Sequence, residues 1–429
     1  MTGARPTSTM IDPRREFALL FMVMFTIAVG NTALQTVMPA IGRSLKLPDT
    51  AVAVAFSVSA LLWVIAAPFW ANRTARYGYR RMVLLGLGGF TLSLALCGIF
   101  LTLGILGVIA PGLTFVAFII SRLIYGTFGA AAPPATQALV AATTSRDQRT
   151  KALTLLASAF GLGTIVGPAL APFFILPGVS FAGPAFIFAG FGLVIWIMAF
   201  IFLPTRPSMG SDVHGAMSAY PSVGGQGTGA TVNAALGARG GVVRWRDRRI
   251  RTWLVIGIAM SHGQAMIGQT MGFLIIDRLA LPLMDAQQSI GIVLMMGAGA
   301  ALLAQWGIIP LLGLTPRGLC LWGLGLAGAG CCMLSTAGNL HSISIAYALA
   351  SLGFGFVRPG FNAGASLAVR AGEQASVAGK ITSVGGGAFV LGPSIGVGLY
   401  EIYRPLPYLV AAVGLVLLLI WAAVKVARD

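Results

Sequence analysis

Twelve long runs of apolar residues, separated by short polar segments, run through this sequence. Each run holds about 20 or more residues, the length of an α-helix that crosses the hydrocarbon core of a bilayer. Gly and Pro occur inside many of the runs, which membrane helices tolerate. The pattern predicts an all-α membrane protein with twelve transmembrane helices, at residues 17–39, 50–71, 82–103, 113–142, 151–176, 183–204, 251–276, 287–313, 318–337, 342–368, 377–400 and 404–427.

Composition indicates that lipid is the solvent of this chain. Of its 429 residues, 57% are hydrophobic and 9% are charged, whereas a soluble protein carries about 25% charged residues. A net charge of +17 would suggest a nucleic-acid partner in a soluble protein. Here the charges lie in short segments between apolar runs, so we interpret them as determinants of topology and expect a lipid bilayer, and no nucleic acid, as partner.

The distribution of Lys and Arg predicts the orientation of the helices. If both termini are cytoplasmic, the cytoplasmic segments contain 22 of these residues and the opposite side contains four, Arg43, Lys46, Arg278 and Arg404. Cytoplasmic loops of membrane proteins carry an excess of Lys and Arg. We therefore expect a multi-pass protein of the bacterial inner membrane with both termini in the cytoplasm.

Residues 206–243 divide the chain into two groups of six apolar runs. This segment is rich in Gly, Ala and Ser and has no apolar periodicity, which is typical of a flexible linker. A basic run, 244–251, follows it. The predicted domains are an N-terminal six-helix bundle at 1–204, a cytoplasmic linker at 205–250 and a C-terminal six-helix bundle at 251–429.

The two groups of runs repeat one another. Residues 35–48 match residues 269–282, since both stretches begin with Gln-Thr and end with Leu-x-Leu-Pro. Pro134 matches Pro359 at a spacing nine residues shorter, and the extra stretch 104–112 in the first group accounts for the difference. Parallel six-helix repeats predict a pseudo-twofold axis along the membrane normal, with the substrate bound between the repeats near mid-membrane.

Arg122 and Arg358 each lie in the middle of an apolar run. An arginine at mid-membrane costs about 2.5–3.5 kcal/mol on the insertion scale, so it is kept where it faces water, a partner or a substrate. No acidic residue lies deep in any run; Glu16, Asp277 and Glu401 lie at run ends. The pattern predicts a positively charged central cavity that favours neutral, zwitterionic or anionic solutes.

The fifth run contains Gly163-x-x-x-Gly167-Pro168, and the eleventh run contains a copy of its end, Gly392-Pro393. Small residues let one membrane helix approach another closely, and a proline bends the helix. The segment resembles the Gly-x-x-x-Gly-Pro motif of membrane antiporters. Ordinary helix packing is the alternative interpretation of the same residues.

Two further motifs carry the same resemblance. Arg122-x-x-x-Gly126 in the fourth run resembles an Arg-x-x-x-Gly motif, and the loop after the second run retains Arg76, Gly78 and Arg80 of the pattern Gly-x-x-x-Asp-Arg-x-Gly-Arg-Arg. Over nearly its whole length the chain resembles the major facilitator superfamily, and within it the twelve-helix drug:proton antiporters. The resemblance implies a role for Arg122 in proton coupling. Ala75 replaces the loop acid that helps to lock one state in this family, which puts the usual gate in doubt.

Polar residues at mid-depth on the first, fourth, seventh and tenth runs are the candidates for a site. The substrate-binding candidates are Asn31, Gln35, Arg122, Gln264, Gln269, Arg358 and Asn362. The proton-coupling candidates are Arg122, His262 and Asp277, and histidine has an unperturbed pKa near 6.5. Four alternatives stay open: an Arg122 satisfied by backbone carbonyls in a kinked bundle, helix–helix hydrogen bonds by the amides, a neutral His262 bonded to a neighbouring helix, and an Asp277–Arg278 ion pair at the external rim.

These observations predict a secondary active transporter that exports a small amphiphilic solute or drug in exchange for protons, by alternating access. The alternative is an importer or facilitator of an organic anion or another metabolite. An enzyme is disfavoured because no nucleophile–base set or metal cluster is visible, and direct drive by ATP because no phosphate-binding Gly-Lys-Ser/Thr loop occurs. We expect a small-molecule substrate and protons as partners, no cofactor, no metal and a monomer.

Overall fold

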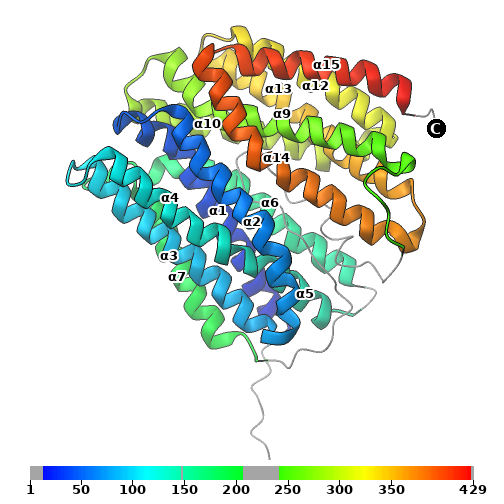
Figure 1. The fold of residues 1–429 in the computed structure, drawn as a ribbon, viewed down its shortest axis with the longest axis horizontal. Coiled ribbons are helices and arrows are strands. Elements are labelled where there is room, and N and C mark those ends of the chain that lie inside the picture. The colour runs from blue at the N-terminus through cyan, green and yellow to red at the C-terminus, as the bar shows by residue number, and fades with distance from the viewer. Residues whose placement is uncertain (1–12, 146–147, 206–240, 427–429) are drawn as a thin grey trace, which may run out of the picture.

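The structure of this protein is a computed structural model that describes residues 13–145, 148–205 and 241–426. All the regular elements in these residues are helices, which run side by side through the molecule (Figure 1). The prediction of an all-α protein is therefore confirmed. Residues 206–240, the greater part of the expected linker at 205–250, lie outside the described residues.

The first group of helices contains two crossings with internal breaks. A 3-10 turn, η1 (Gly129–Ala131), separates α4 from α5 just before two consecutive prolines, which cannot donate to a helical ladder. The elements are α1 (Pro13–Ser44), α2 (Asp49–Tyr77), α3 (Tyr79–Ile105), α4 (Pro111–Phe128), α5 (Ala132–Thr143), α6 (Arg149–Leu170), the 3-10 turn η2 (Ala171–Phe174) and α7 (Gly183–Phe202).

The second group begins after the linker. Its elements are α9 (Arg248–Leu279), α10 (Leu283–Leu302), a π-helical turn η3 (Leu303–Ile308), α11 (Ile309–Leu312), α12 (Pro316–Thr336), α13 (Leu340–Leu367), a 3-10 turn η4 (Ala371–Glu373), α14 (Gln374–Ile402) and α15 (Leu406–Lys425). Local sequence fixes several of these starts. The Thr315 side chain caps α12, and Asn339 and Ser342 form a capping box at the start of α13.

Eleven helices in the described residues are long and apolar enough to cross a membrane, by length and composition. They correspond to eleven of the twelve predicted runs. The run at 251–276 lies in α9, a 32-residue helix that is absent from this set. Ser261, His262, Gln264 and Gln269 lower the hydropathy of α9, as expected of a helix that lines a polar path. The protein is a multi-pass membrane protein, and a crossing by α9 remains a prediction.

Close helix packing depends on small residues within each group. A Cβ atom at Gly330 of α12 would lie 2.4 Å from the backbone nitrogen of Ala350 in α13, and one at Gly353 would lie 2.3 Å from that of Ala327. In Figure 1, α3, α4 and α7 lie on the left, and α12, α13 and α15 lie toward the top. Side chains such as Leu193 and Leu417 point outward and are exposed, as lipid-facing residues are.

We name the two ends of the helical array by residues that lie there. The Asp277 end carries the last residues of α1, α9 and α14 and the first residues of α2. The Glu373 end carries the first residues of α1, α6, α9 and α14 and the last residues of α5.

Candidate transport site

Arg122 of α4 is buried, with 1% of the residue exposed. Its Nη2 donates a hydrogen bond of 2.5 Å to Oδ1 of Asn31 in α1. Its guanidinium carbon lies 4.5 Å from the ring centre of Tyr125 and 5.2 Å from that of Phe56, within the range of cation–π attraction. An amide and two aromatic rings of the first group therefore hold this charge.

Arg358 of α13 is buried as well, with 6% of the residue exposed. Its Nη2 donates a hydrogen bond of 2.5 Å to Oε1 of Gln264 in α9. Gln264 also lines a cavity of about 20 Å³ between α6, α9, α10 and α13, which Thr164 of the first group borders. A space of this size holds about one water molecule. Each group thus contains a buried arginine bound to an amide on its own first helix.

Gln35 and Gln269 are buried near the point where α1 meets α9. A Cβ atom at Gly272 of α9 would lie 2.6 Å from Cγ of Pro39 in α1, so the two helices are in contact there. Each glutamine lies about one helical turn from this crossing, toward the Glu373 end. These two candidates therefore border the contact between the groups.

Asn362 follows Arg358 by four residues on α13, which places both on one face of that helix. Its buried Oδ1 has no hydrogen-bond partner among the described residues. The structure joins four of the substrate-binding candidates in two pairs, Asn31 with Arg122 and Gln264 with Arg358.

His262 makes its hydrogen bond within its own helix. Its Nδ1 lies 2.8 Å from the backbone oxygen of Ile258, one turn earlier in α9. The alternative stated above, in which His262 bonds to a neighbouring helix, is therefore not the contact that the structure describes. Asp277 lies about 22 Å further along α9, at 1.5 Å per residue. The two proton-coupling candidates on α9 therefore lie at different levels of the array.

Asp277 joins the two groups at their common end. Its side chain is 7% exposed and accepts a hydrogen bond of 3.1 Å from Nη2 of Arg43 in α1. Tyr400 of α14 donates to the same carboxylate oxygen at 2.8 Å, and Nε of Arg404 lies 3.5 Å from it. Arg43 also forms a two-pronged ion pair with Asp49, at 2.6 and 2.8 Å. This Asp277 cluster connects α1, α2, α9 and α14.

The alternative of an ion pair between Asp277 and Arg278 is wrong. Arg278 donates to the backbone oxygens of Ser335 and Ala337 at 2.9 and 3.1 Å, at the end of α12. Consecutive residues of a helix do not face each other. Arg278 therefore points to α12 while Asp277 points to the first group.

Three further hydrogen bonds join the groups in the half of the array nearest the Asp277 end. They connect Gln287 Nε2 to the backbone oxygen of Thr36 at 3.2 Å, Ser57 to Ser394 at 2.7 Å, and the Thr50 backbone nitrogen to Glu401 at 2.9 Å. Together with the Asp277 cluster, these contacts hold the groups together at this end.

The Gly-Pro motifs lie at close helix contacts in both groups, α6 on α1 and α14 on α9, at Gly163, Gly167, Pro168, Gly392 and Pro393. A Cβ atom at Gly167 would lie 2.2 Å from Oγ1 of Thr32 and 2.5 Å from a backbone oxygen of α1. A Cβ atom at Gly392 would lie 2.7 Å from Cβ of Ala265. The close approach attributed to these motifs is therefore present in the structure.

The loop between α2 and α3 turns at Gly78, whose φ of 87° lies in the region that glycine adopts without strain. Arg80 donates to the backbone oxygen of Phe200 and to Oγ1 of Thr205, next to the end of α7. The guanidinium of Arg76 lies 5.8 Å from the ring centre of Tyr77. These motif residues make their described contacts within the first group.

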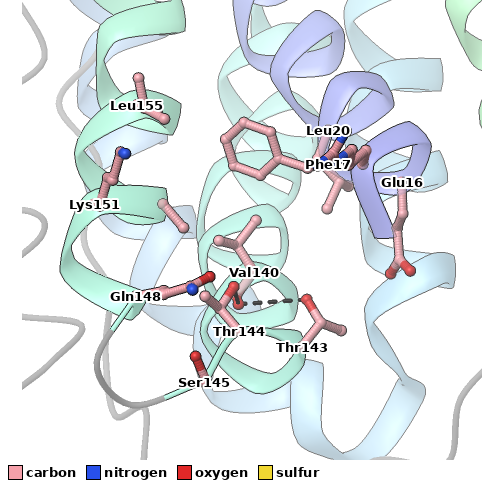
Figure 2. Close-up of a pocket in the computed structure, with 12 residues that line it drawn as sticks. Glu16, Phe17, Leu20, Val140, Thr143, Thr144, Ser145, Gln148, Lys151 and Leu155 are labelled. Carbon is pink, nitrogen blue, oxygen red and sulfur yellow. Dashed lines mark hydrogen bonds between the residues drawn. The ribbon is translucent and has the colours of Figure 1, made fainter. Parts of the chain in front are cut away.

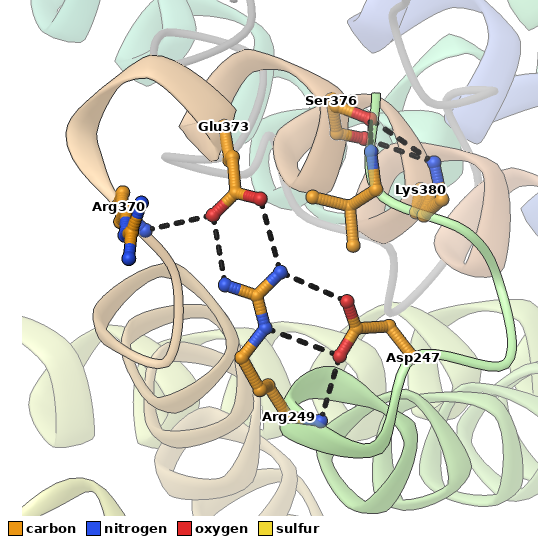
Figure 3. Close-up of polar contacts among 7 residues, drawn as sticks. Asp247, Arg249, Arg370, Glu373, Ser376 and Lys380 are labelled. Carbon is orange, nitrogen blue, oxygen red and sulfur yellow. Dashed lines mark hydrogen bonds and ion pairs between the residues drawn. The ribbon is translucent and has the colours of Figure 1, made fainter. Parts of the chain in front are cut away.

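A second ion-pair cluster lies at the Glu373 end, within the second group (Figure 3). Arg249, at the start of α9, bonds to Asp247 at 2.9 Å and to Glu373 at 2.8 Å. Hydrogen bonds from the Arg249 guanidinium hold the pKa values of both carboxyl groups below their usual range. No group of three His, Cys, Asp or Glu in the described part of the chain could hold a metal ion.

The sequence profile of the Major Facilitator Superfamily matches residues 20–393 of this chain. The chain belongs to this superfamily. Two curated relatives come from Bacillus subtilis (strain 168). Multidrug resistance protein 1 is 28% identical over 207 residues, which is 48% of this chain and 50% of that protein. Multidrug resistance protein 2 is 26% identical over 183 residues, 43% of this chain and 42% of that protein. The chain spans about half the length of these relatives.

Solved structures of other superfamily members share the fold. The crystal structure of the nucleoside transporter NupG has a TM-score of 0.69 at 12% identity and covers 98% of this chain and 100% of its own. That of the human organic anion transporter MFSD10 (TETRAN) has a TM-score of 0.62 at 18% identity and covers 96% of this chain and 100% of its own. At these identities the likeness shows the superfamily fold alone.

Sequence reasoning missed the cation that binds Asp277, although the repeat contained the signal. In the matched stretches 35–48 and 269–282, Arg43 and Asp277 occupy the same position. Residues related by a pseudo-twofold axis meet each other when they lie near that axis. The opposite charges of this matched pair could have predicted their contact. In this superfamily member the pair forms the centre of the Asp277 cluster.

Proposed function

We propose that this protein is a secondary active transporter that exports a small amphiphilic solute in exchange for protons. Two six-helix bundles, residues 1–204 and 251–429, would rock about a site between them. A cytoplasmic linker at 205–250 would join them, and α9 would cross the membrane in addition to the eleven other helices. The observation that carries the proposal is the pair of buried arginine–amide contacts, Arg122 with Asn31 and Arg358 with Gln264. The protein would act as a monomer in a bacterial inner membrane.

The charges favour an anionic, neutral or zwitterionic solute. The acids among the described residues lie at helix ends or beside them, at Glu16, Asp49, Asp247, Asp277, Asp285, Glu373 and Glu401. A cationic solute at the depth of Arg122 would find no carboxylate among these. A solute carboxylate or sulfonate could replace the amide oxygen on either guanidinium, because a charged acceptor binds more strongly than a neutral one.

Contacts between the groups support a conformation closed at the Asp277 end. The Asp277 cluster and the Ser57–Ser394 hydrogen bond must break before the groups can separate there. The excess of Lys and Arg predicts that the opposite, Glu373 end faces the cytoplasm. In this proposal the described conformation is closed toward the outside, and alternating access requires the Asp277 end to open.

Asp277 and His262 are the proposed proton carriers, and the contacts favour Asp277. A proton on its carboxylate would remove the negative charge that attracts Arg43 across the groups, and so would weaken the closed end. His262 bonds to its own helix, so its protonation has no such direct effect on a contact between groups. Proton uptake from the outside would thus be linked to opening toward the outside.

The coupling is tested by cross-linking Ser57→Cys to Ser394→Cys in a background that carries Cys332→Ser, because Cys332 is exposed. The disulfide should form quickly at pH 7.5 and several-fold more slowly with Asp277→Asn. Arg404→Gln is the matched control, since Arg404 lies further from Asp277 than Arg43 does. Equal rates in all three backgrounds would show that Asp277 does not hold this end closed.

Transport itself is tested in proteoliposomes with an imposed pH gradient and a panel of amphiphilic solutes. Export predicts accumulation in inverted vesicles when their interior is acidic, and no accumulation without the gradient. The second candidate is an importer or facilitator of an organic anion. The two buried arginines favour it equally, and one structural neighbour is an organic anion transporter by name. Uptake restricted to right-side-out vesicles would select this candidate.

A further inference from the structure

A cavity of about 560 Å³ opens at the Glu373 end between α1, α5 and α6 (Figure 2). Its volume is in the range of small-molecule sites, about 300–1,000 Å³. It lies apart from the buried arginines, because the Val140 that lines it is separated from Arg122 by about 27 Å of helix. None of the motifs discussed above contributes to it.

One side of the cavity is apolar. Phe17 and Leu20 of α1, Val140 of α5 and Leu155 of α6 line it. In Figure 2 the ring of Phe17 points across the gap toward α6. These side chains can cover the apolar body of a solute, which would release water from both surfaces.

The other side of the cavity is polar and carries positive charge. Thr144, Ser145, Gln148 and Lys151 line it. Lys151 is exposed, and none of the ion pairs between the described residues includes it. The carboxylate of Glu16 is drawn on the side of α1 away from Lys151 (Figure 2). Arg14 of α1 also lines the cavity, so two cations and one carboxylate lie at its walls.

A buried amide lies between the cavity and the middle of the membrane. Gln137 of α5 is 6% exposed, and its Oε1 has no hydrogen-bond partner among the described residues. It precedes Val140 by three residues and Thr144 by seven, so all three share one face of α5. A polar group on a solute that moved inward from the cavity would meet this oxygen first.

We propose that this cavity is a cytoplasmic vestibule that binds an amphiphilic anion before it reaches the arginines at mid-membrane. The ligand has an apolar body of drug size, which contacts Phe17 and Leu155, and an acidic head group, which contacts Lys151. The inference rests on the proposed function for its direction of use. Binding at the vestibule is independent of the arginine sites.

The test is protection of a cysteine in the cavity from alkylation. Thr144→Cys is made in a Cys332→Ser background, because the other three cysteines are buried, and is placed in nanodiscs of zwitterionic lipid. The probe is 11-dansylaminoundecanoate, compared with an undecyl trimethylammonium salt. Ala142→Cys is the control, since Ala142 is exposed two residues away and does not line the cavity.

The proposal predicts that the carboxylate probe slows alkylation of Thr144→Cys at least fivefold and the ammonium probe does not. Protection should fall in Phe17→Ala and in Lys151→Gln, persist in Arg122→Ala, and be absent at Ala142→Cys. Equal protection by both probes, or protection that survives Lys151→Gln and Phe17→Ala together, would overturn the vestibule. Protection without transport of any panel solute would instead overturn the proposed function and leave the vestibule in place.

Discussion

The two six-helix groups each hold one buried arginine, but the arginines are not counterparts. At the spacing of the Gly-Pro motifs, the position that corresponds to Arg122 is Tyr347, and Arg358 lies about three turns further along α13. The amides that they bind, Asn31 and Gln264, do lie at matching positions of α1 and α9 to within one residue. The two arginines therefore lie at different positions of their helices, yet their guanidinium groups bind amides at equivalent positions of α1 and α9.

The surroundings of the two pairs differ as well. Rings of Phe56 and Tyr125 flank Arg122 within the first group. Gln264, the partner of Arg358, lines a small cavity that both groups border. The comparison indicates that Arg122 is the more tightly held charge, suited to coupling. Arg358 is the charge closer to the space between the groups, suited to binding a solute.

The largest effect should come from Arg122→Ala. The change removes a hydrogen bond to a charged group, worth about 1.5–3 kcal/mol, and cation–π contacts worth about 2 kcal/mol when desolvated. Together these losses predict a fall in proton-driven transport on the order of 1,000-fold, at tenfold per about 1.4 kcal/mol. Arg122→Lys keeps the charge without the planar fork and should retain partial activity. Near-normal accumulation by Arg122→Ala in reconstituted vesicles would contradict the role assigned to this residue.

A smaller and more selective effect is expected from Arg358→Gln. The amide preserves hydrogen bonding but removes the charge, so the loss is about that of one charge-assisted bond, or about tenfold. Transport of acidic solutes should fall more than transport of neutral ones. Measuring both solute classes with the same vesicles gives an internal control. An equal fall for both classes would show that Arg358, like Arg122, acts in coupling and does not select acidic solutes.

The Gly-Pro motifs offer a matched pair of stability tests. Gly167→Ala would place a methyl group 2.5 Å from a backbone oxygen of α1 and closer still to the Thr32 hydroxyl, whereas Gly392→Ala would place one 2.7 Å from Cβ of Ala265 and 3.3 Å from the nearest backbone atom of α9. Overpacking of this kind costs about 1–3 kcal/mol. Thermal unfolding in detergent should show the larger loss for Gly167→Ala. A larger loss for Gly392→Ala would mean that the second group is the more rigid one.

The smallest expected effect concerns Arg249 at the Glu373 end. The pKa values of Asp247 and Glu373 are lowered by Arg249, so the contribution of these contacts to stability is present above the ordinary carboxyl pKa of about 4. It is lost as the pH falls through the lowered values. Arg249→Gln should reduce thermal stability slightly at pH 7, and the reduction should shrink as the pH is lowered below the ordinary carboxyl pKa of about 4. Arg251→Gln is the control, and a loss that stays the same as the pH falls would point to another cause.

Helix positions were predictable because a bilayer fixes both length and polarity. The run predicted at 183–204 is α7, Gly183–Phe202, since lipid requires about 20 apolar residues in a row with all backbone groups bonded internally. The α9 helix was also predicted, but its polar residues keep it out of the set of described helices that are apolar enough to cross a membrane by composition.

Side-chain partners were harder to predict because they depend on the rotation of each helix. Proximity in sequence suggested Arg278 as the partner of Asp277, but adjacent residues point about 100° apart on a helix. The repeat relates Asp277 to Arg43, and this longer-range signal, which sequence reasoning did not use, points to the partner that the structure shows. In the same way, Arg122 and Asn31 were both candidates, but their direct contact required the packing of α4 relative to α1.

The central claim is that a solute and protons exchange through a path that contains both buried arginines. The most direct measurement is proton movement in proteoliposomes that enclose a pH-sensitive dye and have an acidic interior. Addition of a transported amphiphilic anion should make the interior less acidic in vesicles with the native protein, and not in vesicles with Arg122→Ala. Solute accumulation without any proton movement, or equal proton movement in both preparations, would contradict the account.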